Sequence, residues 1–147
     1  MAVYSHRKGQ DRYNSDTIPK ISKENKISCE GKITLPEMEK VIKTFKLNKT
    51  PGNDGLPVEF YVKFWKNLNI PMKDSFNYSY DKGLLSNSQR QAVITLLEKS
   101  GKNRLLVKKW RPISLLNCDY KILSKCIAQR LKRVISTIIH PNQTGFV

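Results

Sequence analysis

The stretch WRPISLLNCDYKILSKCIAQRL, residues 110–131, changes its hydrophobic period without an intervening loop. Its first part, 111–116, is a short apolar run that is typical of a strand. From Cys118 to about Ile138 apolar residues recur at helical spacing, and Asn117 stands where a helix cap would be. The predicted core face of this helix contains Leu123, Ile127, Leu131, Val134, Ile135 and Ile138, and the opposite face carries Lys121, Lys125 and Lys132. The sequence thus predicts a strand that leads directly into a long amphipathic helix.

A partner for this strand lies upstream, at about 91–97. This run contains AVITLL, which is short, β-branched and bounded by turn residues, and the chain is expected to turn at Ser100–Gly101. The two runs predict one β-hairpin with many cations on or beside it: Lys99, Lys102, Arg104, Lys108, Lys109 and Arg111. Such a group can hold phosphate, because arginine offers two parallel N–H donors and lysine a point charge. A solvated surface hairpin is the alternative, although solubility does not require an arginine directly before Pro112.

Three shorter helices are predicted before the hairpin. Thr34 and Glu37 have the spacing of a capping box, and the helix that follows has Met38, Val41, Ile42 and Phe45 on one face. The turn-rich segment 47–57 ends it. A second helix begins at Pro57, with an aromatic stripe that we interpret as core: Phe60, Tyr61, Phe64, Trp65 and Leu68. A third runs from Pro71 to Gly83, with Met72, Phe76 and Tyr80 inside.

These elements predict an α+β fold that is mainly helical, with one basic β-hairpin followed by a long helix. Residues 1–30 are polar and non-periodic, which is typical of a flexible leader or of a linker remnant. An isolated hairpin is only marginally stable in water. The two strands therefore need the flanking helices, a further sheet, or both.

The charge of the chain predicts a polyanionic partner. The 147 residues contain 27 Lys and Arg against 12 Asp and Glu, which gives a net charge of +15. From Gly83 onward there are twelve basic residues and two acidic ones, Glu98 and Asp119. Nucleic acid is the commonest ligand of such a surface.

Several other classes of protein are disfavoured. The three cysteines and two histidines have no metal-ligand spacing, and His140 is better explained as a helix-terminal residue than as a base. There is no glycine-rich phosphate loop and no close pair of carboxylates for metal ions. The cysteine pattern, the lack of a secretory signal and the absence of a long apolar run predict an intracellular protein, cytoplasmic or nuclear, without a membrane partner.

Taken together, several segments resemble the reverse transcriptases of LINE-type, non-LTR retrotransposons. Residues 48–65, NKTPGNDGLPVEFYVKFW, are similar to the block that opens the fingers region in this family, and residues 86–147 are similar to the next blocks. The segments WRPISLL, YKILSK and QTGF carry the resemblance most specifically. It implies that 31–147 form part of a reverse transcriptase domain, the incomplete fingers subdomain of a right-hand polymerase.

The resemblance also implies roles for individual residues. Lys99 and Arg111 match positions that contact the triphosphate of the incoming nucleotide. The residues expected to shape the fingers or face the template are Pro51, Gly52, Asp54, Gly55, Gln143, Gly145 and Phe146. The full-length parent would bind an RNA template, a DNA primer and dNTP, while the remaining cations would form a basic nucleic-acid surface: Lys102, Arg104, Lys108, Lys109, Lys121, Lys125 and Lys132.

Two departures from the family pattern affect what this chain can do. Glu98 stands where the family usually has proline, and a carboxylate beside a triphosphate would repel it. The Tyr/Phe-x-Asp-Asp segment that holds Mg²⁺ in the family's palm does not occur in these 147 residues. We therefore expect no cofactor bound by this chain and no polymerisation by it alone. Two alternatives stay open: a non-catalytic nucleic-acid-binding remnant, and a relic reading frame without a stable product.

Overall fold

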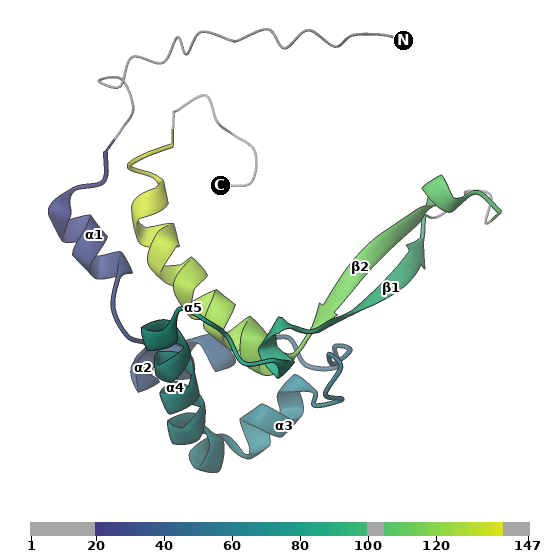
Figure 1. Ribbon diagram of the computed structural model, residues 1–147, viewed down its shortest axis with the longest axis horizontal. Coiled ribbons are helices and arrows are strands. Elements are labelled where there is room, and N and C mark those ends of the chain that lie inside the picture. Colours follow the sequence, from purple (N-terminus) through teal and green to yellow (C-terminus); the bar gives the residue numbers. More distant parts are fainter. Residues whose placement is uncertain (1–19, 100–104, 140–147) are drawn as a thin grey trace, which may run out of the picture.

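The computed structural model describes residues 20–99 and 105–139. Within these ranges it is an α+β structure with five α-helices and one two-stranded antiparallel sheet. In chain order the elements are α1 (Lys23–Cys29), α2 (Leu35–Ile42), α3 (Val58–Lys63), α4 (Trp65–Lys82), β1 (Ala92–Glu98), β2 (Trp110–Leu116) and α5 (Cys118–Ile135). Figure 1 shows the helices gathered on one side and the hairpin projecting from them.

The core lies where α2, α4 and α5 meet. The predicted capping box of α2 is confirmed: the Thr34 backbone N–H donates to the Glu37 carboxylate at 3.0 Å. This cap orients the apolar face of the helix inward, where Met38 is fully buried. Phe76 of α4 and Ile122 of α5 are buried against the same cluster. Local capping therefore fixes the direction in which α2 presents its side chains to the core.

The second and third helices begin and end at other residues than predicted. The break lies at Phe64, whose φ of −100° and ψ of 18° are not helical, and α4 then continues through Pro71 to Lys82. Pro71 removes one backbone donor, but packed side chains on both sides of it keep the helix continuous. Gly83 ends α4 with a left-handed φ of 65°, as predicted.

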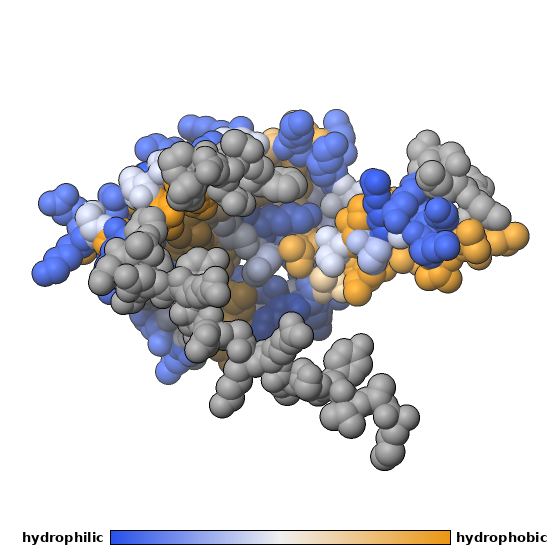
Figure 2. Space-filling model, turned by 90° about the horizontal axis from the view of Figure 1, so that it is seen from above, coloured by the Kyte–Doolittle hydropathy of each residue, from blue (hydrophilic) through white to orange (hydrophobic). Residues whose placement is uncertain are grey.

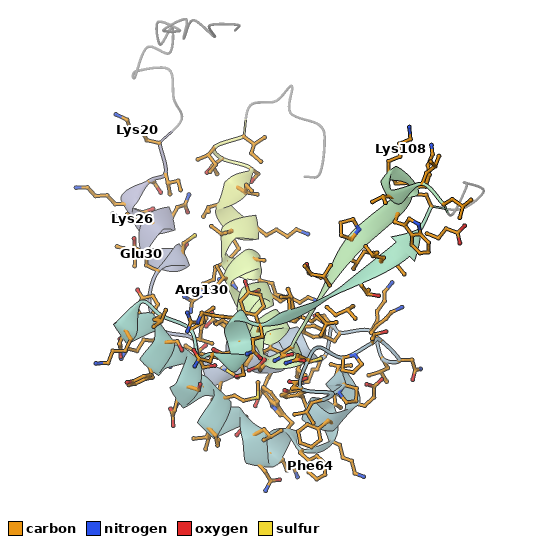
Figure 3. All side chains as sticks on the ribbon, turned by 45° about the vertical axis from the view of Figure 1, so that its right-hand side comes forward. Lys20, Lys26, Glu30, Phe64, Lys108 and Arg130 are labelled. Carbon is orange, nitrogen blue, oxygen red and sulfur yellow. The ribbon has the colours of Figure 1, made fainter. Side chains whose placement is uncertain are left out.

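The predicted inner faces of α3 and α4 need two corrections. Phe64 is 42% exposed, and Figure 3 shows it at the surface. Tyr80 is 57% exposed, and its neighbour Ser79 is buried in its place. Met72, Phe76 and Ser79 follow the i, i+4, i+7 stripe of α4, so Tyr80 falls at the edge of that stripe.

The predicted core face of α5 is partly wrong. Leu123 and Val134 are buried, but Ile127, Leu131 and Ile135 are exposed. The buried face is instead formed by Cys118, Ile122, Leu123, Cys126, Arg130 and Val134. Of these residues only Arg130 is polar, and it is buried because Glu37 and the carbonyl oxygens of the segment 30–32 satisfy its guanidinium.

The segment predicted to be a polar leader contains α1, which lies beside α5 (Figure 1). Ser22 caps this helix by accepting a hydrogen bond from the Asn25 backbone N–H at 3.2 Å. The buried Arg130 of α5 holds the connection from α1 to α2: its guanidinium donates to the carbonyl oxygens of Gly31 at 2.7 Å and Lys32 at 2.8 Å. Residues 20–30 are thus joined to the helical core, and residues 1–19 lie outside the described part of the chain.

Candidate nucleotide-binding hairpin

The predicted hairpin is confirmed, and its register assigns each side chain to a face. Leu97 pairs with Arg111, Glu98 pairs with Trp110, and the Lys99 backbone N–H donates to the Lys109 carbonyl at 2.9 Å. Directly opposed residues of an antiparallel ladder share a face, and successive residues alternate between faces. Leu97 and Arg111 therefore share one face of the hairpin, and Lys99 and Lys109 adjoin its outer end, just beyond the paired residues.

Glu98 belongs to the opposite face of the ladder, with Trp110. A carboxylate next to Lys99 in sequence is thus directed to the other side of the hairpin. Because side chains alternate between the two faces of a strand, Glu98 would repel a triphosphate bound on the face of Arg111 less than its sequence position suggested.

The two residues expected to contact triphosphate differ in their present contacts. The Lys99 ammonium donates to the Lys108 carbonyl oxygen at 2.9 Å, across the outer end of the hairpin. Arg111 is exposed on β2, and within residues 20–99 and 105–139 no hydrogen bond or ion pair involves its side chain. A guanidinium without a carboxylate partner keeps all its donors for an external anion.

The loop 51–55 lies at the other end of the hairpin, where β2 passes into α5. Gly52 packs so closely there that a Cβ on it would lie 2.5 Å from the Asn117 nitrogen and 2.6 Å from the Leu116 carbonyl carbon. The Asn117 side chain accepts from the Asp54 N–H at 3.4 Å and donates to the Ser88 carbonyl at 3.0 Å. Asn117 stands at the N-cap position of α5, but its side chain makes no capping hydrogen bond there and joins three segments.

The remaining residues of this loop stabilise its shape. The Gly55 N–H donates to the Gly52 carbonyl at 3.2 Å, and Gly55 has a positive φ of 70°. Asp54 accepts from the Leu56 N–H at 3.0 Å and lies near the Tyr61 hydroxyl, 3.5 Å away. Burial, with the nearby Asp119 and Asp54 carboxylates, raises the pKa of Tyr61 and keeps it neutral. The loop supports the base of the hairpin and is separated from Lys99 by the length of the strands.

The other predicted basic residues occupy three places. Lys108 and Lys109 lie in a short 3-10 turn, Val107–Lys109, at the outer end of the hairpin, where Figure 3 shows Lys108. Lys132 is exposed on α5, whereas Lys121 and Lys125 are half-buried beside α2 rather than on a solvated face. Residues that fall outside the described ranges are Ser100, Gly101, Lys102, Arg104, His140, Gln143, Gly145 and Phe146.

Apolar side chains are exposed on both faces of the hairpin. Val93 and Leu97 lie on the face of Arg111, while Ile94, 69% exposed, and Leu96 lie on the other. Figure 2 shows this hydrophobic surface along the projecting hairpin. The helices therefore cover the base of the hairpin and leave its length uncovered, in keeping with the expectation that the two strands need further structure.

The described residues contain neither a candidate metal site nor a candidate membrane span. There, no three His, Cys, Asp or Glu side chains gather as metal ligands. None of the helices in the same ranges is long and apolar enough to cross a membrane.

Comparison with known proteins agrees with the resemblance seen in the sequence. Residues 97–147 match the family described as "Reverse transcriptase (RNA-dependent DNA polymerase)", a range that includes Lys99 and Arg111. The chain is also similar to the "Transposon TX1 uncharacterized 149 kDa protein" of Xenopus laevis, with 43% identity over 129 residues. That alignment covers 88% of this chain and 10% of the relative, so the chain spans about a tenth of that protein's length. The chain is a segment of a reverse transcriptase and belongs to the LINE-type, non-LTR retrotransposon family.

Proposed function

We propose that the β1–β2 hairpin belongs to the fingers of a LINE-type reverse transcriptase and binds the triphosphate of the incoming nucleotide through Lys99 and Arg111. The observation that carries this proposal is the position of Lys99, Lys109 and Arg111, three cations gathered at the outer end of a two-stranded ladder. A triphosphate at that end would meet converging positive charge. Glu98, on the opposite face, would not be directed at it.

The two side chains have different chemical parts in the proposed site. Arg111 can donate two parallel N–H bonds to a pair of phosphate oxygens, and no described carboxylate competes for it. Lys99 must first release the Lys108 carbonyl, and an ammonium gains a stronger partner when it exchanges a neutral carbonyl for a phosphate oxygen. Arg111 therefore fixes the orientation of the triphosphate, and Lys99 adds charge.

In the parent protein this site would serve RNA-directed DNA synthesis, the transfer of a nucleotide from dNTP to a primer end on an RNA template. Mg²⁺ is the metal expected for that reaction. Residues 20–99 and 105–139 do not bring together a donor set for it, so none of the steps proposed for this chain passes through a metal. What these residues can do is bind and orient the triphosphate.

Binding of inorganic triphosphate to the 147-residue chain, measured by isothermal titration calorimetry, tests the proposal. We expect Arg111→Ala to weaken binding about tenfold, and Arg111→Lys to recover only part of the loss because lysine lacks the planar pair of donors. Arg133→Ala is the matched control, since Arg133 is an exposed arginine on α5. Equal losses in Arg111→Ala and Arg133→Ala would mean that only net charge matters, as a non-catalytic basic module predicts.

Catalysis by the chain alone is a separate question. Because the sequence has no Tyr/Phe-x-Asp-Asp segment, we expect the purified chain to extend no primer on an RNA template with dNTP and Mg²⁺. Extension above background, abolished by EDTA, would contradict this expectation.

A further inference from the structure

We propose that the side of β1 that faces away from β2, here called the β1 edge, is a dimerisation surface for a second copy of this chain. The two β1 strands would pair in antiparallel orientation about a twofold axis at Thr95, and the two hairpins would form one four-stranded sheet. This inference goes beyond the proposed function, because it concerns the edge of the hairpin and not the cations at its outer end. It is carried by the hydrogen-bond pattern of the ladder and by the order of residues along β1.

The ladder determines which backbone groups face away from β2. Pro112 has no N–H, so its pair with Leu96 is a non-hydrogen-bonded one. The bond from the Lys99 N–H to the Lys109 carbonyl, three positions further along, agrees with the alternation of the two kinds of pair. Four residues of β1 consequently direct their backbone N–H and carbonyl groups away from β2: Ala92, Ile94, Leu96 and Glu98.

The β1 edge lacks the features that keep the edges of sheets apart from other chains. Among the described residues the sheet consists of β1 and β2, and Ile94 and Leu96 make no backbone hydrogen bond outside it. Residues 92–97 include no proline and no charged residue. β2 differs, because Pro112 offers no N–H on its outward side and Arg111 places a charge next to it. A second chain can therefore pair with β1 more readily than with β2.

The length of β1 fits a pairing of two copies about Thr95. With the axis there, Ile94 of one copy is opposite Leu96 of the other, and Ala92 is opposite Glu98. All four outward-facing residues then form hydrogen-bonded pairs, and Thr95 faces Thr95 in a non-hydrogen-bonded pair. Moving the axis to Ile94 or Leu96 would place an end residue of the strand opposite a position outside it. The register centred on Thr95 thus satisfies the most backbone groups.

Apolar side chains meet on both faces of the proposed sheet. Ile94 and Leu96, which are 69% and 57% exposed in the single chain, contact each other on one face. Val93 meets Leu97 on the other face, beside the pair of Thr95 hydroxyls. Apolar pairs and Thr–Thr pairs of this kind stabilise antiparallel strands. Dimerisation would thus cover part of the apolar surface along the projecting hairpin that the helices leave exposed (Figure 2).

Charge favours the antiparallel over the parallel orientation. Two parallel copies in register would place Glu98 next to Glu98 and Lys99 next to Lys99, and like charges at that distance repel. In the antiparallel dimer Glu98 lies opposite Ala92, two residues from Arg90 of the second copy. The net charge of +15 opposes association of two copies, and salt screens that repulsion. The dimer should therefore become tighter as salt is raised, unlike a complex with a polyanion.

Sedimentation velocity of the nuclease-treated chain, over about 5 to 500 µM and at low and high salt, tests the proposal. The interface involves one pair of short strands, so we expect a weak dimer, with a Kd of about 10–100 µM that falls as salt rises. At concentrations well below this Kd the hairpin is that of the single chain and exchanges its amides rapidly.

A proline on either edge of the hairpin identifies the strand that pairs. We expect Ile94→Pro to raise the Kd at least about tenfold, because it removes an outward N–H and leaves the β1–β2 ladder intact. Ser114→Pro is the matched control, since Ser114 pairs with Ile94 and faces outward on β2. Its Kd should equal that of the wild type.

Cysteine substitution tests the register without a proline, and it decides if Ile94→Pro fails to fold. The two Thr95 Cα atoms would be about 4.5 Å apart, within the range of about 4.4–6.8 Å that a disulfide requires. In a chain that carries Cys29→Ser, we expect Thr95→Cys to form a covalent dimer under mild oxidation. Leu97→Cys should form at least about fivefold less, because Leu97 faces Val93 of the second copy and not Leu97.

Several results would overturn the proposal. A chain that stays monomeric over the whole range in high salt has no such surface. Equal weakening by Ser114→Pro and Ile94→Pro, or equal cross-linking by Leu97→Cys and Thr95→Cys, would exclude the β1 edge or its register. A dimer that nuclease treatment abolishes would be bridged by a bound polyanion. Inorganic triphosphate binding by Ile94→Pro should match the wild type, so failure here is distinguishable from failure of the Arg111 proposal.

Discussion

Arg130 is the residue on which the junction of α1, α2 and α5 depends. It is 7% exposed, it donates to Glu37 through two nitrogens, at 2.7 and 2.8 Å, and it also satisfies carbonyl oxygens of the segment 30–32. Removing one member of a nearly buried pair leaves the other charge and several acceptors without a partner. Glu37 also caps α2, so one arginine couples a helix start to the packing of two other helices.

Substitution of Arg130 tests this coupling. We expect Arg130→Met to lower the free energy of unfolding by about 3 kcal/mol, because the Glu37 charge and the carbonyls lose their donors. Urea unfolding followed by circular dichroism measures the loss. Arg133→Met, at an exposed position of the same helix, should change stability by less than about 0.5 kcal/mol. Similar losses in both variants would contradict the role assigned to Arg130.

The same ion pair makes stability depend on pH. Hydrogen bonding to Arg130, opposed by burial and aided by Thr34, lowers the pKa of Glu37 from 4.5 to about 2. The folded protein therefore keeps Glu37 ionised at pH values where the unfolded chain protonates it. Its contribution is complete above about pH 4.5, falls as the pH falls and is lost near pH 2.

Glu37→Gln isolates this contribution. Relative to the variant, the wild-type chain should lose about 1–2 kcal/mol of stability between pH 4.5 and pH 2, a figure reduced for the partial exposure of the carboxylate. Unfolding by urea at several pH values gives the difference curve. A difference that is flat across this range would show that the pair does not stabilise the fold.

Position 52 requires glycine because there is no room for a Cβ, and not because of its backbone conformation. A Cβ there would meet the Asn117 nitrogen and the Leu116 carbonyl carbon, and backbone atoms cannot move aside as a side chain can. We expect Gly52→Ala to cost about 1–3 kcal/mol and to shift the loop away from the hairpin base. Gly55→Ala, with a positive φ and no atom within 4 Å of the added carbon, should cost about 1 kcal/mol. A milder effect at position 52 than at position 55, in thermal unfolding, would contradict this distinction.

At the scale of the elements, the sequence predicted those features that depend on residues close together in the chain. The Thr34–Glu37 capping box, the change of period at 91–97 and the glycine end of α4 were readable because each involves residues within a few positions. Pro71 misled the prediction, since its cost to the helix is local whereas the packing that keeps α4 continuous is tertiary.

The buried face of α5 was predicted only in part, for a related reason. The sequence offers apolar residues on neighbouring arcs of this helix, and the choice between them depends on partners far away in sequence, such as the segment 30–32 that contacts the buried Arg130. Asn117 could have been found only in part: its place before the helix indicates a cap, but the Ser88 carbonyl 29 residues upstream does not follow from any pattern. Of the candidate site, the hairpin and its cations were predictable, whereas the close packing of Gly52 against Leu116 and Asn117 at its base was not.

The hairpin should be the least stable element of the described fold. Among the described residues the backbone ladder joins β1 to β2 alone, and apolar side chains on both faces are exposed. Hydrogen exchange followed by mass spectrometry should therefore show rapid exchange in β1 and β2, at least about tenfold faster than in the Ile122 region of α5. Equal protection of hairpin and helix would mean that the uncovered strands are stabilised by something other than the helices.

At the scale of the whole molecule, the cysteines report whether this chain folds by itself. Cys118 and Cys126 are buried in the core, where desolvation raises both thiol pKa values, that of Cys126 to about 11, while Cys29 is only half-buried. Only the thiolate reacts readily, so a disulfide reagent such as DTNB at pH 8 should modify one of the three cysteines quickly and two slowly. Cys29→Ser should remove the fast phase.

Urea at a denaturing concentration should convert all three thiols to the fast phase, because unfolding removes the burial that protects two of them. A chain that shows three fast thiols without urea would have no packed helical core, which is the result expected of a relic reading frame. The contrast matters for the proposed site, since the base of the hairpin is joined to the helices through Asn117, the residue before α5. One fast thiol, two protected thiols and a cooperative loss of that protection in urea would establish that the segment folds as a unit.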